Sequence, residues 1–172
     1  DVSKVEAAIT DRTRVVMPVH LYGQMVDMVG LSEVAEARGI EIIEDAAHAL
    51  ESRRGSVSLG SHSRAACLSF YATKNITSGE GGAIVTRDSE FADRLRKLRL
   101  HGMTAGAADR YTGTYRHYGV TEPGWKYNMS DIQAALLIGQ LRRIDDLLEK
   151  RTEAFNRYRD ALGDYNELRL PQ

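Results

Sequence analysis

The sequence contains little of several residue types, and each scarcity narrows the kind of protein it can encode. Among its 172 residues there is one cysteine, Cys67, which excludes an internal disulfide and fits a reducing cytoplasm. No apolar run approaches the length of a membrane-spanning helix. Acidic and basic side chains nearly balance, and a net charge of -1 favours neither a nucleic acid nor a membrane surface as a partner.

What remains is the composition of a globular protein. With 42% hydrophobic residues, the chain can bury one sizeable core, which corresponds to one domain or part of one. It has no internal repeats and begins at Asp1 without a methionine, the first sign that it is a fragment. We expect a cytoplasmic protein with no metal site.

The most informative stretch runs over residues 69–82, SFYATKNITSGEGG. The apolar residues 65–71 predict a buried strand, which is followed at once by Lys74, a polar turn and a glycine cluster. This order places an amine just past a strand end, where ligands of open α/β sheets bind.

A second strand, predicted over residues 40–44, ends on Asp45, with His48 three residues further on. If the two strands are adjacent, Asp45 and Lys74 come together, and an amine facing a carboxylate suits pyridoxal phosphate (PLP). The lysine would hold the aldehyde as a Schiff base, and the carboxylate would pair with the protonated pyridine nitrogen. Each residue also has an ordinary explanation, because most lysines lie on the surface and an aspartate at a strand end usually caps a turn or helix.

The remaining pattern predicts an α/β protein in which parallel strands alternate with helices. A helix capped by Ser3 is expected over residues 2–9, a strand over 14–19, and a helix over 28–38 that stops at Gly39. Residues 51–64 predict a loop with at most one short strand. An antiparallel strand over 83–86 should precede a helix that begins after Asp88 and ends near residue 100. Ser130 and Gln133 predict a capping box for a helix to about residue 148, and a further helix is expected over 152–162.

Five segments resemble, in this order, the DegT/StrS family of PLP-dependent sugar aminotransferases: residues 19–24 (VHLYGQ), 43–49 (IEDAAHA), 69–74 (SFYATK), 79–82 (GEGG) and 127–135 (YNMSDIQAA). The resemblance extends from about residue 2 to about residue 148. It implies a fold type I PLP-transferase large domain, with a mostly parallel sheet flanked by helices and incomplete at both ends. Residues 1–148 would belong to this domain, and residues 149–172 would lead into a missing C-terminal domain.

The same resemblance implies a reaction and a set of site residues. The enzyme would move an amino group from an amino acid, usually glutamate, to a nucleotide-linked keto sugar. Lys74 and Asp45 would be catalytic, His48 would pack near the 3′ oxygen of the cofactor ring, and Ser69 would donate to the cofactor phosphate. For His48 and Ser69, a structural histidine and a strand-end hydroxyl bonded to backbone stay open as alternatives.

The sequence departs from the family pattern at Lys126 and Asn128. Many relatives have an asparagine at the first position and an arginine at the second, and the asparagine contacts the cofactor phosphate of the neighbouring subunit. Here either the ammonium or the amide could make that contact. The resemblance therefore implies a homodimer with a shared site, and the loop over residues 101–123 would reach towards the partner and the substrate.

Two other functions stay open. One is a different PLP reaction on the same scaffold, although relatives that dehydrate sugars lack the lysine that stands here as Lys74. The other is a non-catalytic regulatory relative or an inactive truncated product. The particular sugar, its nucleotide and the carbon that receives nitrogen are not determined by these motifs.

Overall fold

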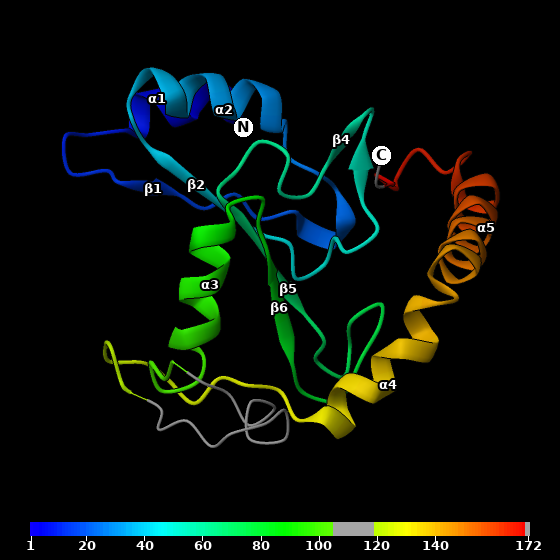
Figure 1. Ribbon diagram of the computed structural model, residues 1–172. Coiled ribbons are helices and arrows are strands. Elements are labelled where there is room, and N and C mark those ends of the chain that lie inside the picture. Colours follow the sequence, from blue (N-terminus) through cyan, green and yellow to red (C-terminus); the bar gives the residue numbers. More distant parts are fainter. Residues whose placement is uncertain (105–118, 171–172) are drawn as a thin grey trace.

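A four-stranded sheet forms the centre of the computed structural model, which describes residues 1–104 and 119–170 (Figure 1). The strand order is β1-β2-β5-β6. Both β1 and β5 pair with β2 in parallel, whereas β6 runs antiparallel to β5. The strands are β1 (Val15–Val16), β2 (Glu41–Asp45), β5 (Ala65–Ser69) and β6 (Gly82–Val85). The mostly parallel sheet confirms the α/β class, and β6 confirms the predicted antiparallel strand.

The helix α2 (Met28–Ala37) connects β1 to β2 and supplies half of the buried residues of the first core. Asp27 caps its start by accepting a hydrogen bond from the Gly30 N–H at 3.3 Å. Its buried side chains pack with those at the start of β2, and the backbone then turns at Gly39, where φ is +62°. The members of this core are Met25, Met28, Leu31, Ala35, Ile40 and Ile42.

Two expectations for the first twenty residues are wrong. The opening helical turns, η1 (Val2–Lys4) and α1 (Val5–Ala8), are capped by Asp1, which accepts from the Ser3 N–H at 3.1 Å, so Ser3 is not the cap. The strand expected over residues 14–19 is only two residues long. Pro18 has no N–H to continue the ladder, although its carbonyl still accepts from the Asp45 N–H at 2.9 Å.

The segment over residues 51–64 contains two short strands where at most one was predicted. The strands β3 (Arg53–Arg54) and β4 (Val57–Ser58) pair antiparallel around a two-residue turn. Gly55 adopts a φ of +61° in this turn, a conformation that glycine reaches without strain. The Gly-Ser pair was the sequence signal for this hairpin.

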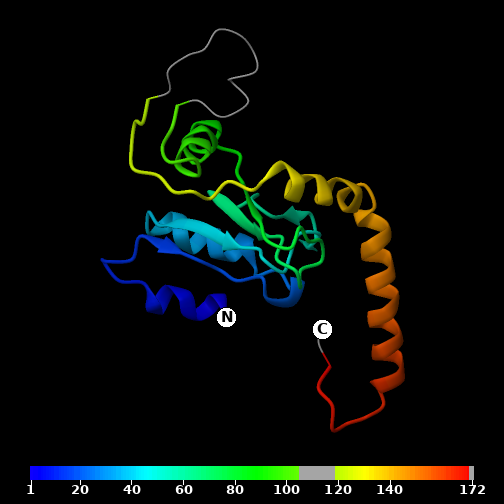
Figure 2. The same ribbon diagram turned by 90° about the horizontal axis from the view of Figure 1, so that it is seen from below.

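In the C-terminal half, both predicted helix caps are confirmed. Asp88 accepts from the Phe91 N–H at 2.9 Å at the start of α3 (Ser89–Leu98), and Ser130 and Gln133 form the capping box of α4 (Asp131–Leu141). The single helix expected up to residue 148 is wrong, because the chain bends at Arg143 and then continues as α5 (Ile144–Leu162). Figure 2 shows α4 and α5 meeting at this bend, with α5 extending along one side of the molecule.

The turn η2 (Leu21–Gly23) follows β1, and it completes the regular elements of the described ranges. The proposed domain division at residue 148 falls within α5 and stays a prediction. Much of the loop expected over residues 101–123 lies outside the described residues. In the part of the chain that the structure covers, no helix combines the length and apolar character needed to cross a membrane.

Candidate functional site

Lys74 lies in the turn between β5 and β6, and buried neighbours anchor this turn. Phe70 and Ile76 are buried on either side of the lysine and pack against Leu137 of α4. The Lys74 N–H donates to the Tyr71 carbonyl at 3.0 Å. The half-buried lysine side chain therefore projects from a segment with little freedom to move.

Side chains from α4 and α5 hold the same turn by hydrogen bonds. The amide of Gln140 brackets Thr77, accepting from its N–H at 3.0 Å and donating to its carbonyl at 2.8 Å. Asn75 donates to Glu51 at 2.9 Å, and Glu51 also forms an ion pair with Arg151 of α5. The residues that flank Lys74 are thus tied to both helices.

A cleft of about 610 Å³ faces Lys74. The loops after β1 and β2, the Lys74 turn and one side of α5 line it. The lining residues are Tyr22, Gly23, His48, Glu51, Ser52, Thr73, Lys74, Asn75, Leu148, Arg151, Thr152 and Phe155. Within the described residues, the Lys74 ammonium has no hydrogen-bond or ion-pair partner, so it is available to a ligand.

Asp45 ends β2 and lies opposite Cys67 in the parallel ladder with β5. Its Oδ1 accepts from the Ala47 N–H at 3.1 Å. Burial raises the pKa of the Cys67 thiol, and the negative charge of Asp45 raises it further, which indicates that the carboxylate lies near β5. The adjacency of the two strands is as predicted, although Asp45 does not line the cleft that faces Lys74.

His48 lines the same cleft as Lys74 and is held by Tyr22. The Tyr22 N–H donates to His48 Nδ1 at 3.3 Å, and the two rings stack with centroids 5.4 Å apart and an interplanar angle of 12°. Tyr22 adopts a φ of +52°, which is uncommon for a residue other than glycine. The imidazole and the amine are thus brought to one cavity by loops that are far apart in the sequence.

The other three predicted site residues lie outside the lining of that cleft. Ser69 ends β5, where its hydroxyl accepts from the Tyr71 N–H at 3.3 Å. Lys126 pairs with Leu100 in an isolated bridge beyond α3, and its ammonium donates to the Asn128 amide oxygen. The structure therefore places Lys126 and Asn128 together but does not bring them to Lys74.

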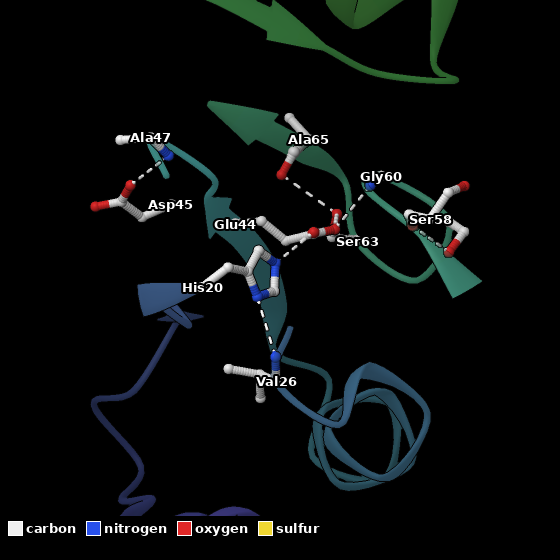
Figure 3. A network of polar contacts seen from close by, with 10 residues as sticks. His20, Val26, Glu44, Asp45, Ala47, Ser58, Gly60, Ser63 and Ala65 are labelled. Carbon is white, nitrogen blue, oxygen red and sulfur yellow. Dashed lines mark hydrogen bonds and ion pairs between the residues drawn. The ribbon is translucent and has the colours of Figure 1, made fainter. Parts of the chain in front are cut away.

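A buried polar network next to Asp45 was not predicted (Figure 3). The side chains of His20 and Glu44 are 0% and 1% exposed, and their Nε2 and Oε2 atoms lie 2.8 Å apart. Glu44 also accepts from the Gly60 N–H at 2.9 Å and from the Ser63 hydroxyl. The available signal was a glutamate at an inward position of an apolar strand, because a buried carboxylate requires partners.

The hydrogen bonds of this network define its charge. Val26 donates its N–H to His20 Nδ1 at 3.2 Å, so the imidazole proton is on Nε2 and points at Glu44. Burial alone would raise the pKa of Glu44, but hydrogen bonds from His20, Ser63 and Gly60 outweigh it and lower the pKa. The network is therefore a neutral imidazole that donates to a carboxylate anion.

Comparison with known proteins shows the family. The sequence profile of the DegT/DnrJ/EryC1/StrS aminotransferase family matches residues 1–172. The chain belongs to this family. The match confirms the resemblance seen in the five sequence motifs, and it extends that resemblance beyond residue 148.

The DegT/DnrJ/EryC1/StrS relatives include proteins of named activity. The chain is 47% identical to the spore coat polysaccharide biosynthesis protein SpsC of Bacillus subtilis, over 99% of this chain and 44% of SpsC. It is 42% identical to the UDP-4-amino-4-deoxy-L-arabinose–oxoglutarate aminotransferase of Shewanella sediminis, over 99% of this chain and 45% of that enzyme. The chain thus spans somewhat less than half the length of these relatives.

A solved structure agrees with this assignment. The PLP-form of Spr1654 from Streptococcus pneumoniae superposes with a TM-score of 0.83 and 31% identity, over 95% of this chain and 45% of Spr1654. Its PMP-form gives a TM-score of 0.85 at the same identity and covers 46% of that chain. The fold described above is therefore that of a DegT/DnrJ/EryC1/StrS aminotransferase over part of its length.

Proposed function

We propose that this chain is the central, cofactor-binding part of a PLP-dependent aminotransferase that acts on a nucleotide-linked keto sugar. The observation that carries the proposal is the ammonium of Lys74, which has no partner among the described residues and lies at a cleft on a turn anchored by buried neighbours. The names of the relatives support it, since one uses oxoglutarate, the keto acid of glutamate, and Spr1654 has PLP and PMP forms.

The described residues fit the cofactor. An amine lies past the end of β5, and a carboxylate lies at the end of β2, its parallel neighbour. Lys74 would hold PLP, and the cofactor would supply an electron sink for chemistry at the α-carbon of the amino donor. Glutamate is the donor we propose.

Each site residue then has a specific task. The Lys74 amine would remove a proton from the α-carbon of the donor and return it. Asp45, as an anion, keeps the pyridine nitrogen protonated, and His48 packs beside the 3′ oxygen of the ring. Ser69 donates to the phosphate, which its present hydrogen bond allows, because a hydroxyl that accepts from Tyr71 still has a proton to donate.

Lys126 and Asn128 would act across a subunit boundary in a homodimer. Their mutual hydrogen bond uses one ammonium proton and the Asn128 amide oxygen. Two ammonium protons and the amide NH₂ are left for the phosphate of the neighbouring subunit, so either side chain could donate.

Residues 1–148 would belong to the large domain of this cytoplasmic enzyme, and residues 149–172 would lead into its C-terminal domain.

The proposal is tested on the full-length protein that contains this chain. After reconstitution with PLP and addition of L-glutamate, the wild type should release 2-oxoglutarate. The Lys74→Ala variant should do so about 10³-fold more slowly, because it lacks the group that moves the proton. Lys150→Ala removes an exposed lysine from α5 and should match the wild type. Equal rates for Lys74→Ala and the wild type would exclude the proposed role.

A further inference from the structure

Glu44 and Asp45 are consecutive residues of β2, so their side chains point to opposite faces of the sheet. Figure 3 shows the Asp45 carboxylate on one side of the strand and the Glu44 carboxylate on the other, directed at His20. The proposed chemistry uses only Asp45. Glu44 and His20 are nevertheless among the most deeply buried side chains of the described residues, which requires an explanation.

The His20 ring is held at both nitrogens. Nε2 donates to Glu44 and Nδ1 accepts from Val26, so the ring can neither rotate nor change tautomer without losing a hydrogen bond. Glu44 is fixed in turn by donors from Gly60 and Ser63, in the segment that follows β4. The network therefore joins three separate parts of the chain to one position of β2.

The backbone of His20 connects this network to Asp45. The His20 N–H donates to the Asp45 carbonyl at 3.0 Å, and the Asp45 N–H donates to the Pro18 carbonyl at 2.9 Å. Fixing the His20 ring thus fixes the segment that pairs with the backbone of Asp45. Movement of this segment would therefore shift the backbone that carries the Asp45 carboxylate.

His20 is also connected to His48, through the turn that contains Tyr22. His20 precedes η2, and the Gly23 N–H donates back to the His20 carbonyl at 3.2 Å, which closes the turn around Tyr22. Tyr22 stacks on His48 and donates to its Nδ1. One buried pair is therefore connected by short hydrogen-bonded paths to both Asp45 and His48.

We propose that Glu44 and His20 are positioning residues, which hold Asp45 and His48 in the geometry that amino transfer requires. This inference rests on the proposed function. It assigns no contact between Glu44 or His20 and the cofactor, and so predicts that their loss alters the rate of the reaction more than the binding of the amino donor.

The decisive variant is Glu44→Gln in the full-length protein. The glutamine oxygen can still accept from Gly60 and Ser63, but its NH₂ group then faces the Nε2–H of His20. Moving the imidazole proton to Nδ1 would set that nitrogen against the Val26 N–H, so one donor always meets another donor. Glu41→Gln is the matched control, because it makes the same change at an exposed position of the same strand.

Two measurements separate positioning from mere stability. The first is hydrogen exchange in the cofactor-free protein, where Glu44→Gln should speed exchange of the His20 and Asp45 amides about tenfold or more while Glu41→Gln leaves it unchanged. The second uses the PLP-loaded protein and L-glutamate as the probe. Glu44→Gln should slow the single-turnover rate about tenfold or more, change the visible circular dichroism of the cofactor, and leave the apparent Kd for glutamate within about threefold.

If Glu44→Gln unfolds more easily but keeps the wild-type exchange, dichroism and single-turnover rate, then Glu44 and His20 contribute only to stability, and the inference is wrong. A second variant covers the case in which Glu44→Gln does not fold. His20→Gln keeps a donor towards Glu44 and should retain more activity than His20→Leu, and equal rates in the two would also overturn the inference. A wild-type protein that forms no PLP adduct at Lys74 would instead contradict the proposed function.

Discussion

At the residue scale, the site depends on side chains that stand next to each other in the sequence but meet different surroundings. Asp45 lies at the end of β2 with one oxygen bonded to the Ala47 N–H, and its other oxygen receives no hydrogen bond from the described residues. Glu44 is enclosed by donors on the opposite face. We infer that Asp45 acts on the cofactor and that Glu44 holds the backbone in place.

Replacing Asp45 by asparagine should leave the fold intact and depress turnover. The asparagine oxygen can still accept from the Ala47 N–H, but it carries no charge to keep the pyridine nitrogen protonated. We expect the rate of reaction with glutamate to fall about 10²-fold, while PLP still binds. Stopped-flow absorbance of the loaded protein measures the rate, with the exposed Asp164→Asn as control. A rate within about twofold of wild type would remove Asp45 from the mechanism.

The buried Glu44 predicts a dependence of stability on pH. Its pKa in the folded protein is lowered from the ordinary value of 4.5, so the carboxylate contributes stability above that pH. This contribution is lost as the pH falls through the lowered pKa. The difference in unfolding free energy between wild type and Glu44→Gln should be constant at neutral pH and shrink below about pH 4.5. Urea unfolding at several pH values measures it. If the difference in unfolding free energy instead grew on acidification, the pKa of Glu44 would be raised by folding and not lowered.

The sequence predicted that Asp45 and Lys74 follow the ends of two strands of one sheet, because short apolar runs that end on a charged residue are a local signal. The pairing of β2 with β5 agrees with this prediction. It did not predict that His20 and Glu44 form a pair. They lie 24 positions apart in the sequence. Their contact depends on how the chain that follows β1 is aligned along β2. Nor could it place Lys126 and Asn128 relative to Lys74.

At the scale of elements, the turn that carries Lys74 depends on α4. Ile76 is 1% exposed, and with Phe70 it packs against Leu137. The glutamine of the same helix, Gln140, brackets Thr77. The position of Lys74 therefore depends on a helix that begins more than fifty residues later.

Truncating Ile76 should destabilise the protein strongly. Removing its buried carbons leaves a cavity beneath the Lys74 turn, and we expect Ile76→Ala to lower the unfolding free energy by about 2–5 kcal/mol. Ile76→Val, which removes a single methylene, should cost about 1 kcal/mol and serves as the graded control. Denaturant unfolding of both variants tests this, and an alanine variant as stable as wild type would mean that the turn is not anchored here.

The starts of α3 and α4 were predicted well because Asp88 and Ser130 are local capping signals. The position at which one helix ends and the next begins was predicted poorly. The bend between α4 and α5 occurs at Arg142 and Arg143, which are good helix formers, and the Arg143 side chain donates to the Gly139 carbonyl in the last turn of α4. The helix propensity of these two residues therefore did not predict the bend.

At the scale of the whole molecule, the chain covers less than half of the length of its relatives SpsC and the Shewanella sediminis aminotransferase. We propose that the site is shared between two subunits. A shared site predicts complementation between inactive variants. Lys74→Ala alone and the double variant Lys126→Ala/Asn128→Ala should each be inactive as full-length homodimers. Mixing them after reversible dissociation should restore about a quarter of wild-type activity, since half the dimers are mixed and each has one intact site. No recovery would place Lys126 and Asn128 in the same subunit's site or outside it.

We propose that Lys74 is the amine that bonds to PLP, and the other assignments depend on it. The most direct measurement is to incubate the full-length protein with PLP, reduce with borohydride, digest and identify the modified peptide by mass. We expect a pyridoxyl group on Lys74 and on no other lysine. A specific adduct on another lysine, or none at all, would contradict it.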